Sequence, residues 1–189
     1  MASVQIVAVS PLENCSLDEL VSPIMESFKV NVKACSHQIV DASFAFDISR
    51  NQFYSTLLLS ALTEKFSSSA DKILGLTSVD LFVPVLTYVF GEAQFDGKSA
   101  IVSTHRLHES FYGLNENPHL TKSRVIKEAI HELGHTFGLP HCHDYLCVMH
   151  SSTGVEEIDL KTKRFCHACE KLVLQKVKLL DLSAHHNGL

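Results

Sequence analysis

The chain has 189 residues, of which 46% are hydrophobic and 20% charged, and its formal net charge is −5. This length suits one domain with a core of its own, and the hydrophobic fraction excludes a disordered chain. Because 21 acidic residues outnumber 16 basic residues, the charge gives no basis for nucleic-acid binding. The chain contains 12 histidines, nine of them between residues 105 and 167, and such a concentration favours a metal site.

The N-terminus and the apolar stretches show no signal for export or membrane insertion. The N-terminus has no basic region, and its apolar run ends at Ser10-Pro11, which is too early for a signal peptide. The longest apolar stretch, Val79–Phe90, contains Asp80 and Pro84 and cannot span a bilayer. We therefore expect a cytoplasmic, monomeric protein that binds neither membranes nor nucleic acid and keeps its six cysteines reduced.

The first third of the chain predicts alternating strands and helices. Apolar patterns predict strands at Val4–Val9 and Val30–Ala34, the second with one polar face. Capping boxes at Ser16–Glu19 and Ser49–Gln52 each predict the start of a helix, the first running to about Phe28.

A β-rich region follows. Ile73–Phe82 predicts one strand, with Gly75 as a bulge. Val85–Phe95 and Lys98–Thr104 flank Asp96-Gly97, a strong signal for a β-hairpin.

The rest of the chain predicts two helices separated by a loop rich in cysteine and histidine. We expect a loop over Phe111–Leu120, a helix over Ser123–Phe137 and an amphipathic helix over Cys166–Leu182. The mixed order of strands and helices predicts an α/β or α+β layer fold in a single domain, residues 1–189.

The first candidate metal site lies on the helix expected over Ser123–Phe137. His131 and His135 are four residues apart, so both imidazoles can reach one ion, and Glu132 lies beside them. The histidines lie opposite the apolar stripe of this helix, which consists of Ile126, Ile130, Leu133 and Phe137.

A third ligand can come from the turn after this helix. Gly138 permits the left-handed conformation that ends a helix, Pro140 prevents continuation, and the reversal can return His141 to the ion. Three protein ligands and one open position are typical of a catalytic zinc. In that case Glu132 is the general base that takes a proton from the zinc-bound water.

Cysteines form a second candidate metal site. Cys142 and Cys147 are followed by Cys166 and Cys169, a spacing that predicts a closed structural zinc with four thiolates. Cys166-His167-Ala168-Cys169 at a helix start also resembles a thiol–disulfide redox motif, so a redox protein remains an alternative.

These motifs together resemble those of the archaemetzincins, a family of metzincin-type zinc metalloproteases. His131 through His141 matches the metzincin zinc signature, and Cys147-Val148-Met149 places a methionine where a Met-turn lies below the metal. The four cysteines narrow the resemblance to archaemetzincins, and Leu81–Pro84 and Phe90–Gln94 extend it over most of the chain.

The resemblance implies a compact metzincin fold, with a twisted mixed sheet and backing helices over about residues 1–138. A small zinc-clamped lower part would comprise about residues 139–189. It also implies a catalytic zinc on His131, His135 and His141, Glu132 as base, Met149 beneath the metal and a second zinc on the four cysteines. His150-Ser151 follows Met149, so a tyrosine switch two residues after the methionine is not supported.

The predicted function is a zinc-dependent peptidase that acts on a peptide or protein substrate by direct attack of water. The arm Val85–Phe95 is expected to hold an extended peptide through main-chain hydrogen bonds. The alternative is a zinc-stabilised peptide-binding protein with little or no proteolytic turnover.

Overall fold

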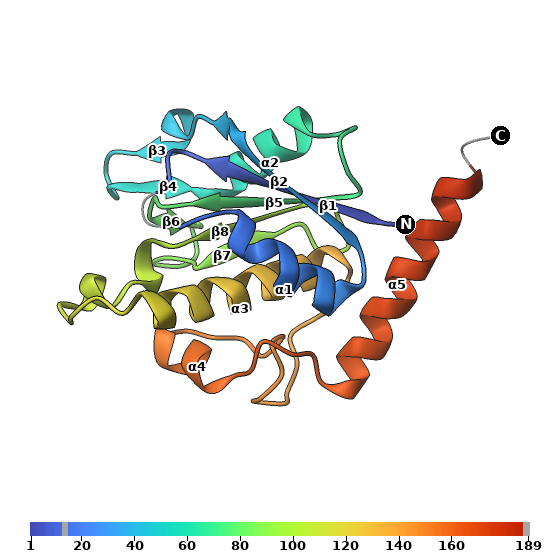
Figure 1. Cartoon of the computed structure of the whole chain (residues 1–189). Coiled ribbons are helices and arrows are strands. Elements are labelled where there is room, and N and C mark those ends of the chain that lie inside the picture. The colour runs from blue at the N-terminus through green and yellow to red at the C-terminus, as the bar shows by residue number, and fades with distance from the viewer. Residues whose placement is uncertain (13–14, 187–189) are drawn as a thin grey trace.

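The computed structural model describes residues 1–12 and 15–186, and its centre is a five-stranded sheet in the order β2-β1-β5-β8-β7 (Figure 1). In that order the strands span Asn31–Val40, Ser3–Val9, Lys72–Thr77, Ser99–Ser103 and Gly91–Ala93. The first four are parallel, and β7 lies antiparallel to β8 at one edge. A small second sheet contains β3 (Phe46–Asp47), β4 (Gln52–Tyr54) and β6 (Leu81–Phe82).

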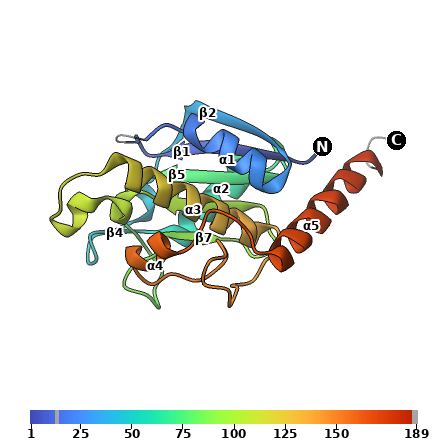
Figure 2. The same ribbon diagram turned by 60° about the horizontal axis from the view of Figure 1, so that its bottom comes forward.

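Helices cover both faces of the main sheet (Figures 1 and 2). They are α1 (Asp18–Phe28), α2 (Ser55–Lys65), α3 (Pro118–Thr136), α4 (Val155–Leu160) and α5 (His167–His186), with short 3₁₀ turns at Ser43–Ala45, His105–Leu107 and Glu109–Tyr112. Successive strand residues point to opposite faces. On β1, Val4 and Ile6 therefore pack into the core with α1 and α3, whereas Val7 and Val9 pack with α2.

Much of this arrangement follows the sequence patterns. The mixed α/β fold is confirmed, as are the strands at β1 and β2 and the helix after the first capping box. Ser16 Oγ accepts the backbone N–H of Asp18 at 3.3 Å, and α1 ends at Phe28 as expected.

The second capping box prediction is wrong. Ser49 Oγ bonds to the Asp47 carboxylate instead of capping a helix, and Asn51 takes a left-handed conformation with φ 54°. The chain then forms β4, and α2 begins only at Ser55.

The strand predicted over Ile73–Phe82 is also wrong in its extent. β5 ends at Thr77, and β6 belongs to the other sheet. Gly75 is not a bulge, because it pairs in regular register with Val7 and Ile101. The hairpin around Asp96 is confirmed, but its first strand is only Gly91–Ala93.

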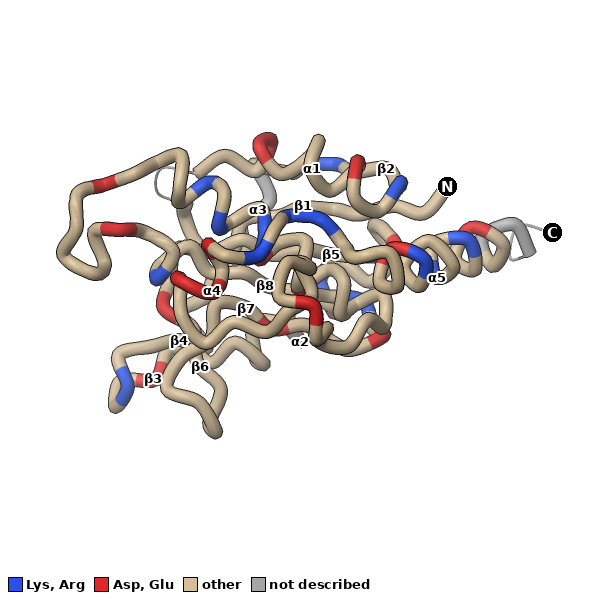
Figure 3. The backbone as a smooth tube through the Cα atoms, turned by 90° about the horizontal axis from the view of Figure 1, so that it is seen from below, with Lys and Arg blue, Asp and Glu red and all other residues tan. Residues whose placement is uncertain are grey.

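The C-terminal helices differ from prediction at their ends. Helix α3 begins at Pro118 rather than Ser123, because Asn117 caps it and proline suits the first helical position. Helix α5 covers the predicted final helix, whereas α4 had no clear sequence signal. Among the described residues no helix is long and apolar enough to cross a bilayer. Seen from below, basic and acidic residues are interspersed along the chain (Figure 3).

Candidate active site

Helix α3 supplies two histidines, and the turn at its end supplies the third. His131 and His135 lie on adjacent turns of the helix. Gly138 has φ 80°, which costs glycine little, and its N–H bonds to the His135 carbonyl at 2.9 Å. The chain reverses there, so His141 returns to the other two, and their ligand nitrogens lie within 4.8 Å of one another.

Hydrogen bonds fix the orientation of the two helical imidazoles. His131 Nδ1 lies 2.8 Å from the Val148 carbonyl oxygen, and His135 Nδ1 lies 2.7 Å from that of Leu139. Because a carbonyl oxygen only accepts, each Nδ1 carries the hydrogen and each Nε2 presents a lone pair.

This arrangement fits a zinc ion. The Nε2 atoms of His131 and His135 are 3.1 Å apart, so two lone pairs face each other with no proton between them. A cation between them removes that repulsion, and zinc–nitrogen bonds of about 2.0–2.1 Å place tetrahedral ligands about 3.3 Å apart. Burial lowers the pKa of His131, His135 and His141 below the ordinary value, which favours the neutral form that binds metal.

Glu132 is a buried carboxyl beside the histidines. Burial raises its pKa well above the ordinary value, and the neighbouring Glu128 raises it further. Gly91 on β7 makes room for this side chain, because a Cβ there would lie 2.6 Å from Glu132 Cγ. A carboxyl held in this way accepts a proton more readily than an exposed one.

Met149 is fully buried against helix α3. Its sulfur packs against Gly134, where an added Cβ would collide with Met149 Sδ. The glycine within the histidine motif therefore lets the helix approach this methionine closely.

A cavity of about 340 Å³ opens beside these groups. Its lining includes residues 86–91, which lead into β7, and residues 151–153 after Met149. His131, Glu132 and His141 also line the cavity, so a molecule that fills it meets all three.

The four predicted cysteines gather in a second cluster. The sulfur atoms of Cys142, Cys147, Cys166 and Cys169 lie within 4.8 Å of one another, and all four are free of disulfides. The sulfurs of Cys142 and Cys166 are 3.8 Å apart. Zinc–sulfur bonds of about 2.3 Å give about 3.8 Å between tetrahedral ligands, so the cluster fits a second zinc.

The thiols of this cluster differ in their surroundings. Burial raises the pKa of Cys147 to about 11 and also raises that of Cys169. The backbone N–H of Cys169 lowers the pKa of Cys166 at the start of α5. Cys15 and Cys35 are free thiols and lie outside the cluster.

The chain matches the model of peptidase family M54 over residues 22–176. It is 45% identical over 128 residues to an archaemetzincin of Methanocaldococcus jannaschii, covering 68% of this chain and 69% of that one. The chain belongs to peptidase family M54, the archaemetzincins.

Solved structures agree with this assignment. A crystal structure of an archaemetzincin from Methanopyrus kandleri matches 94% of this chain and 96% of its own, with a TM-score of 0.79 and 34% identity. A zinc-dependent peptidase from Methanocorpusculum labreanum matches 90% of this chain and 99% of its own, with a TM-score of 0.79 and 28% identity. This archaemetzincin is thus a zinc metallopeptidase by family and by fold, and its substrate is a peptide or protein.

The other nearby histidines lie outside the cluster of three. His150 is half-buried, and its Nδ1 lies 2.8 Å from the Cys142 carbonyl oxygen, whereas His143 and His167 are exposed. Sequence reasoning missed Gly91, whose contact with Glu132 is long-range and leaves no local pattern. It also missed Glu128, which lines the same cavity and could have been found from its three-residue spacing to His131.

Proposed function

We propose that this archaemetzincin hydrolyses peptide bonds in the cavity beside α3, with His131, His135 and His141 holding zinc and Glu132 acting as general base. The observation that carries the proposal is the convergence of three imidazole nitrogens beside a buried carboxyl in an accessible cavity. That combination suits metal-assisted hydrolysis.

The side chains divide the reaction between them. Zinc held by the three nitrogens would supply a Lewis acid that polarises the peptide carbonyl and makes water more acidic. Glu132 takes a proton from the attacking water and later delivers it to the leaving amine. The carbonyls of Val148 and Leu139 hold the helical imidazoles in the binding orientation. Water attacks directly, without an acyl-enzyme.

The edge strand β7 and the segment before it offer a place for an extended peptide. β7 pairs with β8 on one side, and the described residues place no strand on its other side. An extended substrate can bond to such a free edge through its main chain. The arm predicted over Val85–Phe95 is shorter than expected as a strand, but residues 86–91 still line the cavity.

The cysteine cluster would hold a structural zinc and clamp the lower part of the domain. Cys142 and Cys147 lie in the loop after α3, whereas Cys166 and Cys169 lie at the start of α5. A zinc on all four joins residues about 139–189 to one another, beneath the upper part formed by residues about 1–138, in a single domain. Thiolate ligands also need a reducing environment, which supports a cytoplasmic location.

A cleavage assay on an unbiased peptide library tests the proposal. Zinc-loaded protein should cut library members, lose activity on chelation and regain it when zinc is restored. Peptide binding without any cleavage would instead establish the alternative of a zinc-stabilised binding protein.

Thiol titration before and after chelation tests the redox alternative. Four thiols should become reactive only after zinc is removed, and removal of zinc should also lower the melting temperature. A disulfide that forms with no zinc present and no loss of stability on chelation would favour the redox protein.

A further inference from the structure

A buried ion pair lies at the cavity beside the zinc site. Glu128 lines the cavity, and its side chain is only 4% exposed. Lys161, at the end of α4, is fully buried, and its Nζ lies 2.9 Å from Glu128 Oε1. Burying two charges costs their hydration free energy, so a buried ion pair beside a reaction cavity points to a role in that cavity.

Glu128 has hydrogen-bonding capacity that the protein leaves unused. Lys161 Nζ lies 2.9 Å from Glu128 Oε1 as an ion-pair partner, but neither carboxylate oxygen accepts an aligned hydrogen bond from the described residues. Lys161 itself donates to the His150 carbonyl at 3.2 Å. A buried acceptor without a donor is costly, and a ligand that supplies the donor recovers that free energy.

Glu128 lies close to the reacting groups. It precedes His131 by three residues and Glu132 by four, so all three lie on one side of α3. Four residues of helix correspond to a rise of about 6 Å from Glu132. A substrate side chain next to the scissile bond is long enough to reach Glu128 across that distance.

We propose that Glu128 is a specificity-determining residue that accepts a hydrogen bond from a neutral, donor-bearing substrate side chain next to the scissile bond, with glutamine as the best fit. The inference rests on the proposed peptidase function. Leu86, Val89 and Phe90 line the same cavity and suit the aliphatic stem of such a side chain.

Lys161 is the reason why we expect the preferred substrate side chain to be neutral. Its ammonium already compensates the Glu128 carboxylate, so a lysine or arginine from the substrate would add a second, unbalanced positive charge. A substrate carboxylate would face Glu128 with no donor at all. An amide supplies the donor and leaves the pair balanced.

Three nearly isosteric substrates test this preference. Peptides that the enzyme cleaves are made with glutamine, methionine or glutamate at each position flanking the cut bond, and with arginine as a fourth series. At the position that contacts Glu128, kcat/KM should be about tenfold higher for glutamine than for methionine, because methionine offers the carboxylate no hydrogen-bond donor. Glutamate and arginine should be cleaved more slowly than glutamine.

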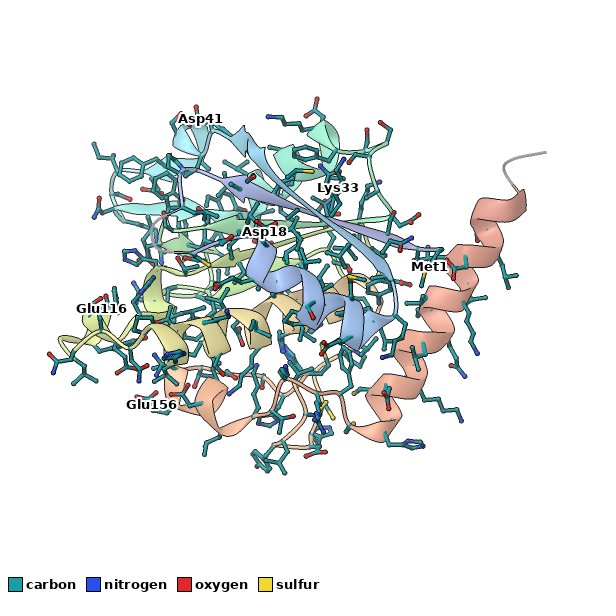
Figure 4. The ribbon with its side chains drawn as sticks, viewed as in Figure 1. Met1, Asp18, Lys33, Asp41, Glu116 and Glu156 are labelled. Carbon is teal, nitrogen blue, oxygen red and sulfur yellow. The ribbon has the colours of Figure 1, made fainter. Side chains whose placement is uncertain are left out.

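Variants of the pair complete the test. Glu128→Gln should reduce the glutamine-over-glutamate ratio about tenfold, since the new amide can donate to a substrate carboxylate. Because this variant leaves Lys161 unpaired, Glu128→Leu combined with Lys161→Met removes both charges at similar volume and should shift the preference to methionine. Glu156→Gln, on the surface of α4 (Figure 4), is the matched control and should keep the wild-type ratios.

Binding separates this inference from the proposed function. The same peptides are titrated by fluorescence anisotropy into Glu132→Ala, with and without Glu128→Gln. A glutamine preference that disappears with Glu128→Gln supports the inference even if no peptide is cleaved. Cleavage or binding with the same ratios in all variants, a preference for arginine, or no binding and no cleavage at all would overturn it.

Discussion

Replacing Gly91 by alanine should displace Glu132, slow hydrolysis and lower stability without unfolding the protein. The new Cβ would lie 2.6 Å from Glu132 Cγ and 2.7 Å from the Ile101 carbonyl oxygen. Carbon atoms normally pack at about 3.5–4.0 Å, so the shortfall is about 1 Å. Ile101 lies in the interior strand β8, so its carbonyl cannot yield and the edge strand β7 must shift, and the Glu132 side chain that faces the new Cβ is displaced as well. A misplacement of about 1 Å costs about 100-fold in rate.

The assay is kcat/KM on a cleaved peptide, measured with zinc content and melting temperature on the same samples. Overpacking should cost about 1–3 kcal/mol of stability in Gly91→Ala. Gly75→Ala is a matched control in the same sheet, because its Cβ would meet only side chains, with the mobile end of Leu62 at 2.6 Å. It should lose comparable stability but no activity. Wild-type kcat/KM in folded Gly91→Ala, or an equal loss in Gly75→Ala, would refute the reasoning.

Two further predictions concern the second zinc and the response to acid. Cys169→Ser should lower the zinc content by one ion per chain and lower the melting temperature. Cys35→Ser, which replaces a buried thiol outside the cluster, should keep both ions. Equal zinc contents of the two variants, measured by mass spectrometry, would contradict the structural site. For Asp80, burial raises the pKa, but hydrogen bonds from Arg106 and Gln52 outweigh it and hold the pKa below its ordinary value. This carboxylate therefore stabilises the fold above its unfolded-state pKa, and the contribution is lost as pH falls through the lower folded-state pKa. Asp80→Asn should flatten the acid side of a plot of melting temperature against pH. An unchanged slope would show that the ion pair between Asp80 and Arg106 does not stabilise the fold.

The sequence predicted the candidate site better than it predicted where helices and strands begin and end. His131, His135 and His141 follow from local geometry, since a four-residue spacing and a glycine-ended helix suffice to bring them together. To predict the cysteine cluster, it was enough to assume that one tetrahedral ion joins the pair Cys142 and Cys147 to the pair Cys166 and Cys169. Both clusters could be predicted because metal ligands must have particular residue types at particular spacings, and these can be seen in the sequence.

Long-range packing accounts for what the sequence did not reveal. Ser49–Gln52 has the residues of a capping box, but its serine bonds to Asp47 and the chain enters β4, whose partner β6 lies far along the sequence. Gly75 looks like a bulge in isolation, yet it lies opposite Leu62 of α2, where the helix approaches the sheet closely. Glu128 was missed, because its burial and its contact with Lys161 depend on a residue 33 positions further along the chain.

The central claim is that hydrolysis depends on Glu132 beside a zinc held by three histidines. The most direct test is the initial rate of peptide cleavage by the wild type and by Glu132→Ala, each shown to contain two zinc ions per chain. We expect cleavage by the wild type and none by Glu132→Ala, with zinc content unchanged. Equal rates of cleavage by the two proteins would contradict the account.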